Sequence, residues 1–243
     1  MRRAMPFGLS KLADHFPSLS VIVYGKDSFE IVGDIHVNAR WGEFIVDEWF
    51  SIKIIAENFP ELPPVCVETS GKVISYHVNP QNNLCLGSPR VLHEEIMAHP
   101  NVVFYINKFI IPFFFSFRYH QRYGTSPFGE LAHGGNGLFP FYREKFKTSD
   151  LAICTLLTYG ANSLYRGHHS CPCGSGLRLR KCHGPRLRAL FKDYHPALLL
   201  TELESCASSL KIHNMGPQRR LFEERYDKAR KILKTLVKEY GKA

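Results

Sequence analysis

The sequence predicts an α+β fold: a four-stranded antiparallel meander with helices, followed by a helical region that carries a small zinc knuckle. Three observations lead to this prediction. Four runs rich in valine, isoleucine and aromatic residues follow one another between residues 20 and 69, separated by short polar turns. After these runs, apolar residues no longer alternate every second position but recur at the spacing of a helix. A group of three cysteines and a histidine interrupts the helical pattern in the second half of the chain.

The first half predicts a short amphipathic helix and then the sheet. The helix is expected at 8–16 and the strands at 20–25, 29–37, 49–55 and 65–69. Short strands joined directly by tight turns favour an antiparallel arrangement. Residues 57–65 contain three prolines, which cannot donate to a sheet ladder, so this segment is expected to cross rigidly between two strands.

The remaining elements are predicted to be helical. Residues 102–117 are the most apolar of the chain, and Asn101 is the expected N-cap. Because this run is shorter than the roughly 20 residues that cross a bilayer, we expect a buried segment and no membrane partner. "HGGNG" at 133–137 is expected to form a turn. Further helices are predicted at 151–157, 186–194, 196–212 and 217–240.

The distribution of charge predicts two domains. Residues 1–150 hold 14 lysines and arginines and 15 acidic residues, whereas residues 151–243 hold 17 and 7. We therefore expect one domain at 1–148 and a basic helical region at 149–243. An anionic partner would meet the second of these. Nucleic acid is one candidate, but it is not favoured because stacking aromatic residues are not interleaved with the basic ones.

The cysteines indicate a reducing compartment. There are seven, an odd number with uneven spacing, which is not typical of a disulfide framework. The basic N-terminus is not followed by the apolar segment of a secretory leader. We therefore expect a cytoplasmic protein.

Four potential metal ligands lie close together in the second half of the chain. Cys171, Cys173, Cys182 and His183 have the spacing C-x-C-x8-C-H and alternate with glycine and proline. Three thiolates and one imidazole complete the closed tetrahedral shell of a structural zinc ion. The segment at about 171–184 resembles the SEC-C motif, a small zinc module best known from the C-terminal tail of the SecA translocation ATPase. That resemblance implies a docking element for protein partners.

Cys85 differs from the other isolated cysteines. Cys66, Cys154 and Cys206 lie in apolar patterns and are expected to be buried. Cys85 follows a run of turn-forming residues, Asn79 to Asn83, and precedes Gly87 and Ser88. A loop cysteine that follows a sheet is well placed to present a reactive thiol.

The order of these features resembles the ubiquitin-conjugating (UBC) fold. In that family a helix and a four-stranded meander enclose a Tyr-Pro-x-x-x-Pro-Pro segment, and a His-Pro-Asn motif precedes the acceptor cysteine. The matching positions here are Phe59-Pro60, Pro63-Pro64, Thr69, His77, Asn79 and "LCL" at 84–86. The tripeptide is His-Val-Asn in this chain, and the resemblance covers roughly residues 8–147.

The resemblance implies an acyl transferase. Cys85 would accept a protein C-terminus as a thioester and pass it to an amine on an acceptor protein. Asn79, or instead Asn82 or Asn83, would donate a hydrogen bond to the oxyanion, and His77 would fix the loop. His133 could also lie near the site. Because it departs from the usual motifs and carries a SEC-C motif, the chain resembles bacterial members of the family. Those found in antiphage cyclic-nucleotide signalling (CBASS) operons conjugate the C-terminus of a cGAS-like nucleotidyltransferase, and others conjugate a ubiquitin-like modifier.

Three other interpretations remain open. An inactive UBC-like or RWD-like module could dock a partner through its zinc-dependent tail. The basic C-terminal region could bind nucleic acid, which would give a steep salt dependence. Cys85 and a distant histidine such as His133 could instead form a cysteine hydrolase.

Overall fold

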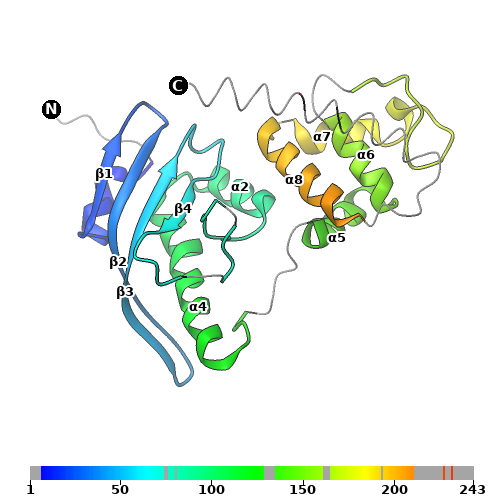
Figure 1. Cartoon of the computed structure of the whole chain (residues 1–243). Coiled ribbons are helices and arrows are strands. Elements are labelled where there is room, and N and C mark those ends of the chain that lie inside the picture. The colour runs from blue at the N-terminus through cyan, green and yellow to red at the C-terminus, as the bar shows by residue number, and fades with distance from the viewer. Residues whose placement is uncertain are drawn as a thin grey trace. The chain divides into compact units, whose positions relative to one another are not determined.

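Figure 1 shows the computed structural model of the chain. It describes residues 7–73, 76–79, 81–128, 135–160, 165–192 and 194–210, together with Asp227 and Lys231. The chain divides into two compact units, Met1–Leu131 and Ala132–Ala243. The first unit contains the sheet and the second is helical, so the predicted α+β class is confirmed.

The first unit contains a four-stranded antiparallel sheet in the order β1-β2-β3-β4, the predicted meander. Two short helical turns precede it, η1 (Leu9–Lys11) and α1 (Leu12–His15). The strands are β1 (Leu19–Val23), β2 (Phe29–Trp41), β3 (Phe44–Ala56) and β4 (Val65–Glu68). The proline-rich segment joins β3 to β4 without strand structure, as expected.

The hairpin of β2 and β3 is longer than the sequence predicted. The predicted strands ended at 37 and began at 49, whereas pairing continues from Val37 with Glu48 to Trp41 with Phe44. Gly42 has a φ of 59°, which suits the first position of a two-residue hairpin turn. Phe44 and Val46 are buried on the face that bears the helices. Burial of these two side chains stabilises strand structure in a segment that also contains polar residues.

Helices cover one face of this sheet (Figure 1). α2 (Pro89–Ala98) is followed by α3 (Val102–Tyr105), the π-helical turn η2 (Ile106–Ile110) and α4 (Ile111–Tyr123). The side chain of Asn101 accepts hydrogen bonds from the backbone of Val103 and Phe104, which confirms the predicted N-cap. Pro112 lacks an N–H and would collide with a carbonyl one α-helical turn earlier, so the wider π turn accommodates it.

The core of the first unit lies between the sheet and this long helix. Phe50 on β3 stacks on Phe114 on α4 with ring centroids 4.1 Å apart, and both side chains are fully buried. The Tyr105 hydroxyl donates to the carbonyl of Pro64 at 2.8 Å and so holds the proline-rich segment against the helix. Of the described helices, only Val102–Tyr123 is long and apolar enough to cross a bilayer. Here it forms the core against the sheet, as expected for a buried segment.

In the part of the second unit that the structure describes, four helices pack around an apolar core. They are α5 (Gly135–Phe146), α6 (Asp150–Gly160), α7 (Gly184–Phe191) and α8 (Pro196–Ser209), with a 3-10 turn η3 (Leu179–Lys181) before α7. The buried Glu202 carboxylate accepts hydrogen bonds from the hydroxyls of Tyr142 and Tyr194, so this charge is not buried without partners. The predicted helix at 217–240 lies outside the described residues except for Asp227 and Lys231.

The helical unit begins earlier than the change in charge suggested. The boundary expected at 148/149 corresponds to one between Leu131 and Ala132. The reason is α5, whose buried Leu138, Phe139 and Tyr142 belong to the core of the second unit. The turn expected for "HGGNG" is also wrong for its described part, because Gly135 begins α5.

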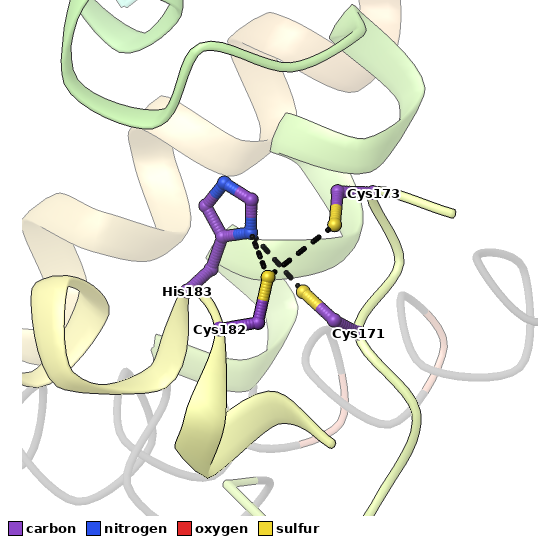
Figure 2. A group of neighbouring side chains, drawn as sticks. All are labelled: Cys171, Cys173, Cys182 and His183. Atoms are coloured by element: carbon purple, nitrogen blue, oxygen red, sulfur yellow. Dashed lines mark hydrogen bonds between the residues drawn. The ribbon is translucent and has the colours of Figure 1, made fainter. Parts of the chain in front are cut away.

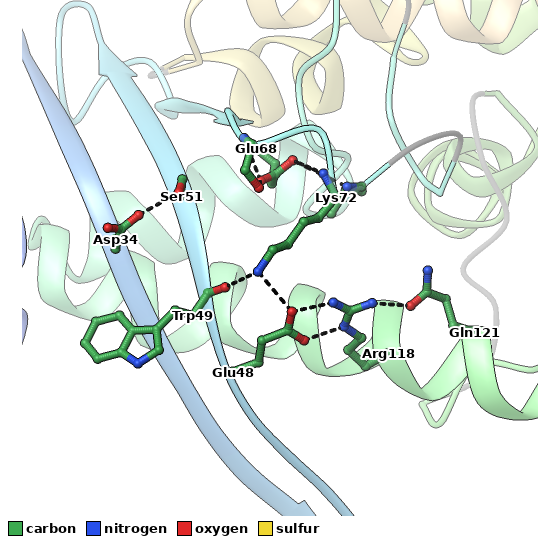
Figure 3. A network of polar contacts seen from close by, with 10 residues as sticks. Asp34, Glu48, Trp49, Ser51, Glu68, Lys72, Arg118 and Gln121 are labelled. Carbon is green, nitrogen blue, oxygen red and sulfur yellow. Dashed lines mark hydrogen bonds and ion pairs between the residues drawn. The ribbon is translucent and has the colours of Figure 1, made fainter.

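An ion-pair network links the sheet to α4. Arg118 Nε and Nη2 on α4 donate to the Glu48 carboxylate on β3 at 2.6 and 2.5 Å, and Lys72 Nζ donates to it at 3.0 Å (Figure 3). Hydrogen bonds from Arg118 and then from Lys72 lower the pKa of Glu48 below its ordinary value. The ion pairs therefore stabilise the folded protein fully at pH values above the ordinary pKa of glutamate. This stabilisation is lost as the pH falls through the lowered pKa of Glu48 in the folded protein.

We expect Glu48→Gln to reduce the free energy of unfolding of the first unit by about 1 kcal/mol at pH 7, since the pair is partly exposed. The difference from wild type should shrink to nothing in acid, where both proteins carry a neutral side chain. Urea unfolding followed by tryptophan fluorescence measures this, because Trp41 and Trp49 are the two tryptophans and both belong to the first unit. A difference that stayed constant from pH 7 to pH 3 would contradict the expectation.

Candidate functional site

A small hairpin presents Cys85 in the first unit. Val78 and Leu84 form an isolated antiparallel bridge, and the Cys85 N–H donates to the His77 carbonyl at 2.7 Å. The Leu84 N–H donates to the carbonyl of Cys66 on β4 at 2.7 Å, which attaches the hairpin to the edge of the sheet. Leu84 is buried while Cys85 is exposed, so the extended backbone points one side chain inward and the next outward.

Asn79 organises the turn of this hairpin. Its Oδ1 accepts from the backbone N–H groups of Gln81 and Asn83, at 3.0 and 2.9 Å. Its own backbone N–H donates to the Asn83 carbonyl at 3.0 Å. Asn82 has a φ of 64°, a conformation that asparagine tolerates better than most residues. The three asparagines considered as oxyanion donors therefore all lie in one turn, and Asn79 fixes its geometry.

His77 lies at the base of the hairpin, opposite Cys85. It has a φ of 47°, and its ring lies 4.6 Å from that of Tyr76. Tyr76 in turn contacts Phe113, Phe117 and His120 on the long helix. The His77 backbone carbonyl thus holds the cysteine strand. His133 lies outside the described residues.

Cys85 is the only cysteine outside the Cys/His group whose side chain is exposed. Cys66, Cys154 and Cys206 are fully buried, as predicted. Burial raises the pKa of Cys66, and the contact with Cys206 together with burial raises that of Cys154. These two thiols are accordingly poor nucleophiles at neutral pH.

Iodoacetamide is expected to alkylate Cys85 first in the folded, metal-loaded protein. Exposure of Cys85 and burial of Cys66, Cys154 and Cys206 set this order. Peptide mass mapping after short exposure measures the modified fraction at each position. In a Cys85→Ser variant the fast phase should vanish, and fast labelling of Cys66 would show that the hairpin opens readily.

Glu68 supports the segment before the hairpin, a role that the sequence did not indicate. Its buried carboxylate accepts from the backbone N–H groups of Ser70 and Lys72, both at 2.9 Å, and from the Ser70 hydroxyl. An acidic residue two positions before the turn-forming Ser70-Gly71 could have indicated that its carboxylate bonds the backbone of the turn.

The four potential metal ligands of the second unit come together as predicted (Figure 2). Their ligand atoms all lie within 4.8 Å of one another. His183 Nδ1 lies 3.1 Å from Cys171 Sγ and 3.2 Å from Cys182 Sγ, and the sulfurs of Cys173 and Cys182 are 3.6 Å apart. A tetrahedral shell with metal–sulfur bonds of about 2.3 Å has ligand separations of roughly 3.7 Å. The group could therefore hold a metal ion with little adjustment.

The histidine is oriented as a metal ligand. Its Nε2 donates to the carbonyl of Phe146, the last residue of α5, at 2.7 Å. The proton is therefore on Nε2, and the Nδ1 lone pair faces the three sulfurs. Metal-binding histidines commonly donate their other ring nitrogen to a carbonyl in this way. The bond also joins the Cys/His segment to α5.

The ionisation of the three thiols depends on their close spacing. Burial raises the pKa of Cys171 to about 12. Burial also acts to raise the pKa of Cys173, but hydrogen bonds from the Ser175 side chain and backbone outweigh it and lower that pKa to about 6. Three neighbouring thiolates repel one another, so all three ionise together only when a bound cation compensates their charge.

The surface around this group is basic. Arg166, Arg178, Arg180, Lys181, Arg186 and Arg188 are all exposed. Arg186 also donates to the Lys145 carbonyl at 2.8 Å near the end of α5, and Arg188 lies over the ring of Tyr165.

The described residues form an α+β protein with an exposed thiol on a hairpin in one unit and, in the other, a Cys₃His group that could hold a metal ion. Comparison of the chain with protein-family models, curated proteins and solved structures gave no match.

Proposed function

We propose that the chain is a ubiquitin-conjugating-like acyl transferase that carries a protein C-terminus as a thioester on Cys85. The observation that carries the proposal is the exposed Cys85 thiol on a hairpin whose turn is fixed by Asn79. A packed structural cysteine needs no such presentation. The order of a short helix, four antiparallel strands, a proline-rich crossing, the cysteine hairpin and a long helix supports a UBC-like fold for this unit.

The chemistry consists of two exchanges. The Cys85 thiolate attacks the carbonyl of an incoming thioester, and the donor's sulfur leaves as a thiolate. A neutral amine of the acceptor then attacks the new thioester. The tetrahedral intermediate carries an oxyanion, which collapses to an amide as the Cys85 thiolate departs, and the amine's proton passes to solvent. Donors aimed at that oxyanion lower the barrier of both steps.

Asn79 is the donor that we propose for the oxyanion. Its Oδ1 is held by the N–H groups of Gln81 and Asn83, so the direction of its Nδ2 amide group is fixed as well. A donor whose orientation is set before the reaction needs no reorganisation in the transition state.

Zinc is the ion that the Cys₃His group suits best, since three thiolates and one imidazole select a tetrahedral ion of intermediate softness. All four ligands come from the protein, so the ion would be structural and the segment SEC-C-like. It would order residues 171–183 against α5, and the basic surface beside it would dock a protein partner.

The biological setting proposed is the bacterial cytoplasm, in an antiphage system where the donor is a cGAS-like nucleotidyltransferase or a ubiquitin-like modifier. The test is co-expression with the neighbouring genes, followed by intact-mass measurement under non-reducing conditions. We expect a reductant-sensitive protein adduct on wild type and none on Cys85→Ala. If a neighbour co-purifies with both proteins but no adduct forms on either, the unit is a docking module and the transferase proposal fails.

A further inference from the structure

One edge of β3 extends beyond its partner strand. β4 pairs only with Ile52–Ile55, whereas β3 begins at Phe44 (Figure 1). Next to β4, the Thr69 N–H donates to the Ser51 carbonyl at 2.9 Å, and Lys72 Nζ donates to the Trp49 carbonyl at 2.8 Å (Figure 3). Among the residues that the structure describes, no strand pairs with 44–48 on this side.

The backbone groups along this edge point outward. The carbonyls of Ser51 and Trp49 face the β4 side, and alternate residues of a strand direct their N–H and C=O groups to the same side. Asp47 and Ile45 therefore present two N–H and two C=O groups away from β2. An open row of this kind accepts a further strand.

A groove of about 440 Å³ runs beside the open edge. One wall is the strand from Phe44 to Glu48, and the other is the end of α4 with Arg118, Gln121 and Arg122. Figure 3 shows Arg118 pointing from α4 toward Glu48, with Gln121 beside it. A strand added to β3 would have alternate side chains directed into this groove.

The charges of the groove leave one cation uncommitted. Glu48 is paired with Arg118 and Lys72, and the Asp47 carboxylate is hydrogen-bonded to His36 Nε2 at 2.5 Å. Arg122 is exposed and lies over the ring of Tyr123, and within the described part of the chain it has no ion pair. An acidic side chain of a bound peptide would therefore find a cation that is not already neutralised.

The charges on the side of the strand that faces α4 are mostly positive. Arg118 and Lys72 surround the single carboxylate of Glu48, and Arg122 lines the groove beside Arg118. Asp47 lies on the opposite face of the strand from Glu48, because successive side chains alternate. These charges favour an acidic segment as the occupant.

We propose that the β3 edge at residues 44–48 binds an extended acidic peptide segment of a partner protein by strand addition, with Arg122 holding one of its carboxylates. The peptide's main chain bonds Ile45 and Asp47, and its carboxylate enters the groove. This proposal is independent of the chemistry at Cys85, so either can fail without the other.

The test uses a display library of short random peptides selected against the full chain, and then fluorescence anisotropy with the selected peptides. We expect enriched peptides to alternate β-branched with acidic residues. Asp47→Pro removes an outward N–H while leaving the bonds to β2, and it should weaken binding at least about tenfold. Asp47→Asn keeps that N–H and is the matched control, with affinity close to wild type.

Two further readouts keep the test decisive. Arg122→Gln should weaken acidic peptides about tenfold but not their glutamine counterparts. In wild type, peptide binding should slow amide exchange at Ile45 and Asp47, which reports on the edge even if Asp47→Pro does not fold. Absence of any enriched peptide, or equal affinity of folded Asp47→Pro and Asp47→Asn, would overturn the proposal.

Discussion

Cys182→Ser is expected to abolish metal binding and to unfold the segment around residues 171–183. The substitution removes one of four ligands, and the three remaining ones no longer close the shell. Structural zinc in small modules contributes on the order of 10 kcal/mol at pH 7, so even partial loss exceeds the stability of a short segment with few helical residues. Loss of the ion also removes the fixed orientation of His183 and with it the bond to Phe146.

Metal content by mass spectrometry should fall from one zinc per chain to none, and amide exchange at residues 171–183 should become faster. Tryptophan fluorescence should not change, because both tryptophans belong to the first unit. A strong chelator should reproduce the effect in wild type. Cys85→Ser is the matched control, since this exposed cysteine lies in the other unit and its loss should leave the zinc in place. Full zinc content in Cys182→Ser would refute the assignment of the ligands.

The second large effect is expected at Asn79, whose side chain holds the turn and, in the proposed function, also donates to the oxyanion. Asn79→Asp keeps a carboxylate oxygen that can accept from Gln81 and Asn83, so the turn should persist. The variant has no amide N–H and places a negative charge beside the developing oxyanion. Given the proposed function, we expect both the loading of Cys85 and the transfer to an amine to be slower, the transfer by about 10²–10³-fold.

Single-turnover aminolysis of the preformed thioester measures this step separately from loading. Asn82→Asp is a useful comparison, because Asn82 lies in the same turn and introduces the same charge nearby. A large loss in Asn79→Asp with a small one in Asn82→Asp supports a direct role for the Asn79 amide. Equal rates for Asn79→Asp and wild type would mean that Asn79 acts only by holding the turn.

Local patterns predicted much of the fold. Alternation of apolar residues indicated four antiparallel strands, and Asn101 was identified as an N-cap from its position before an apolar helix. The Cys₃His group was predictable because its ligands are close in sequence, so little of the fold is needed to bring them together. The exposure of Cys85 followed from its turn-rich surroundings.

The features that were missed depend on contacts distant in sequence. The sequence at the tip of the β2–β3 hairpin is largely polar and did not predict strands. Phe44 and Val46 are buried there, and Phe44 packs against α4, which stabilises the strand structure. α5 begins with glycines, but apolar residues further along it pack with α6 and α8. The bond from His183 to Phe146 spans 37 residues, and no local pattern encodes it.

The bridge between Val78 and Leu84 makes the exposure of the Cys85 thiol depend on whether the turn before it has an odd or an even number of residues. Along this extended segment Leu84 is buried and Cys85 is exposed. Shortening or lengthening the turn by a single residue would exchange the two, burying the sulfur and exposing the leucine. The number of residues between Asn79 and Cys85 is therefore constrained more tightly than their identity, and insertions of two are better tolerated than insertions of one.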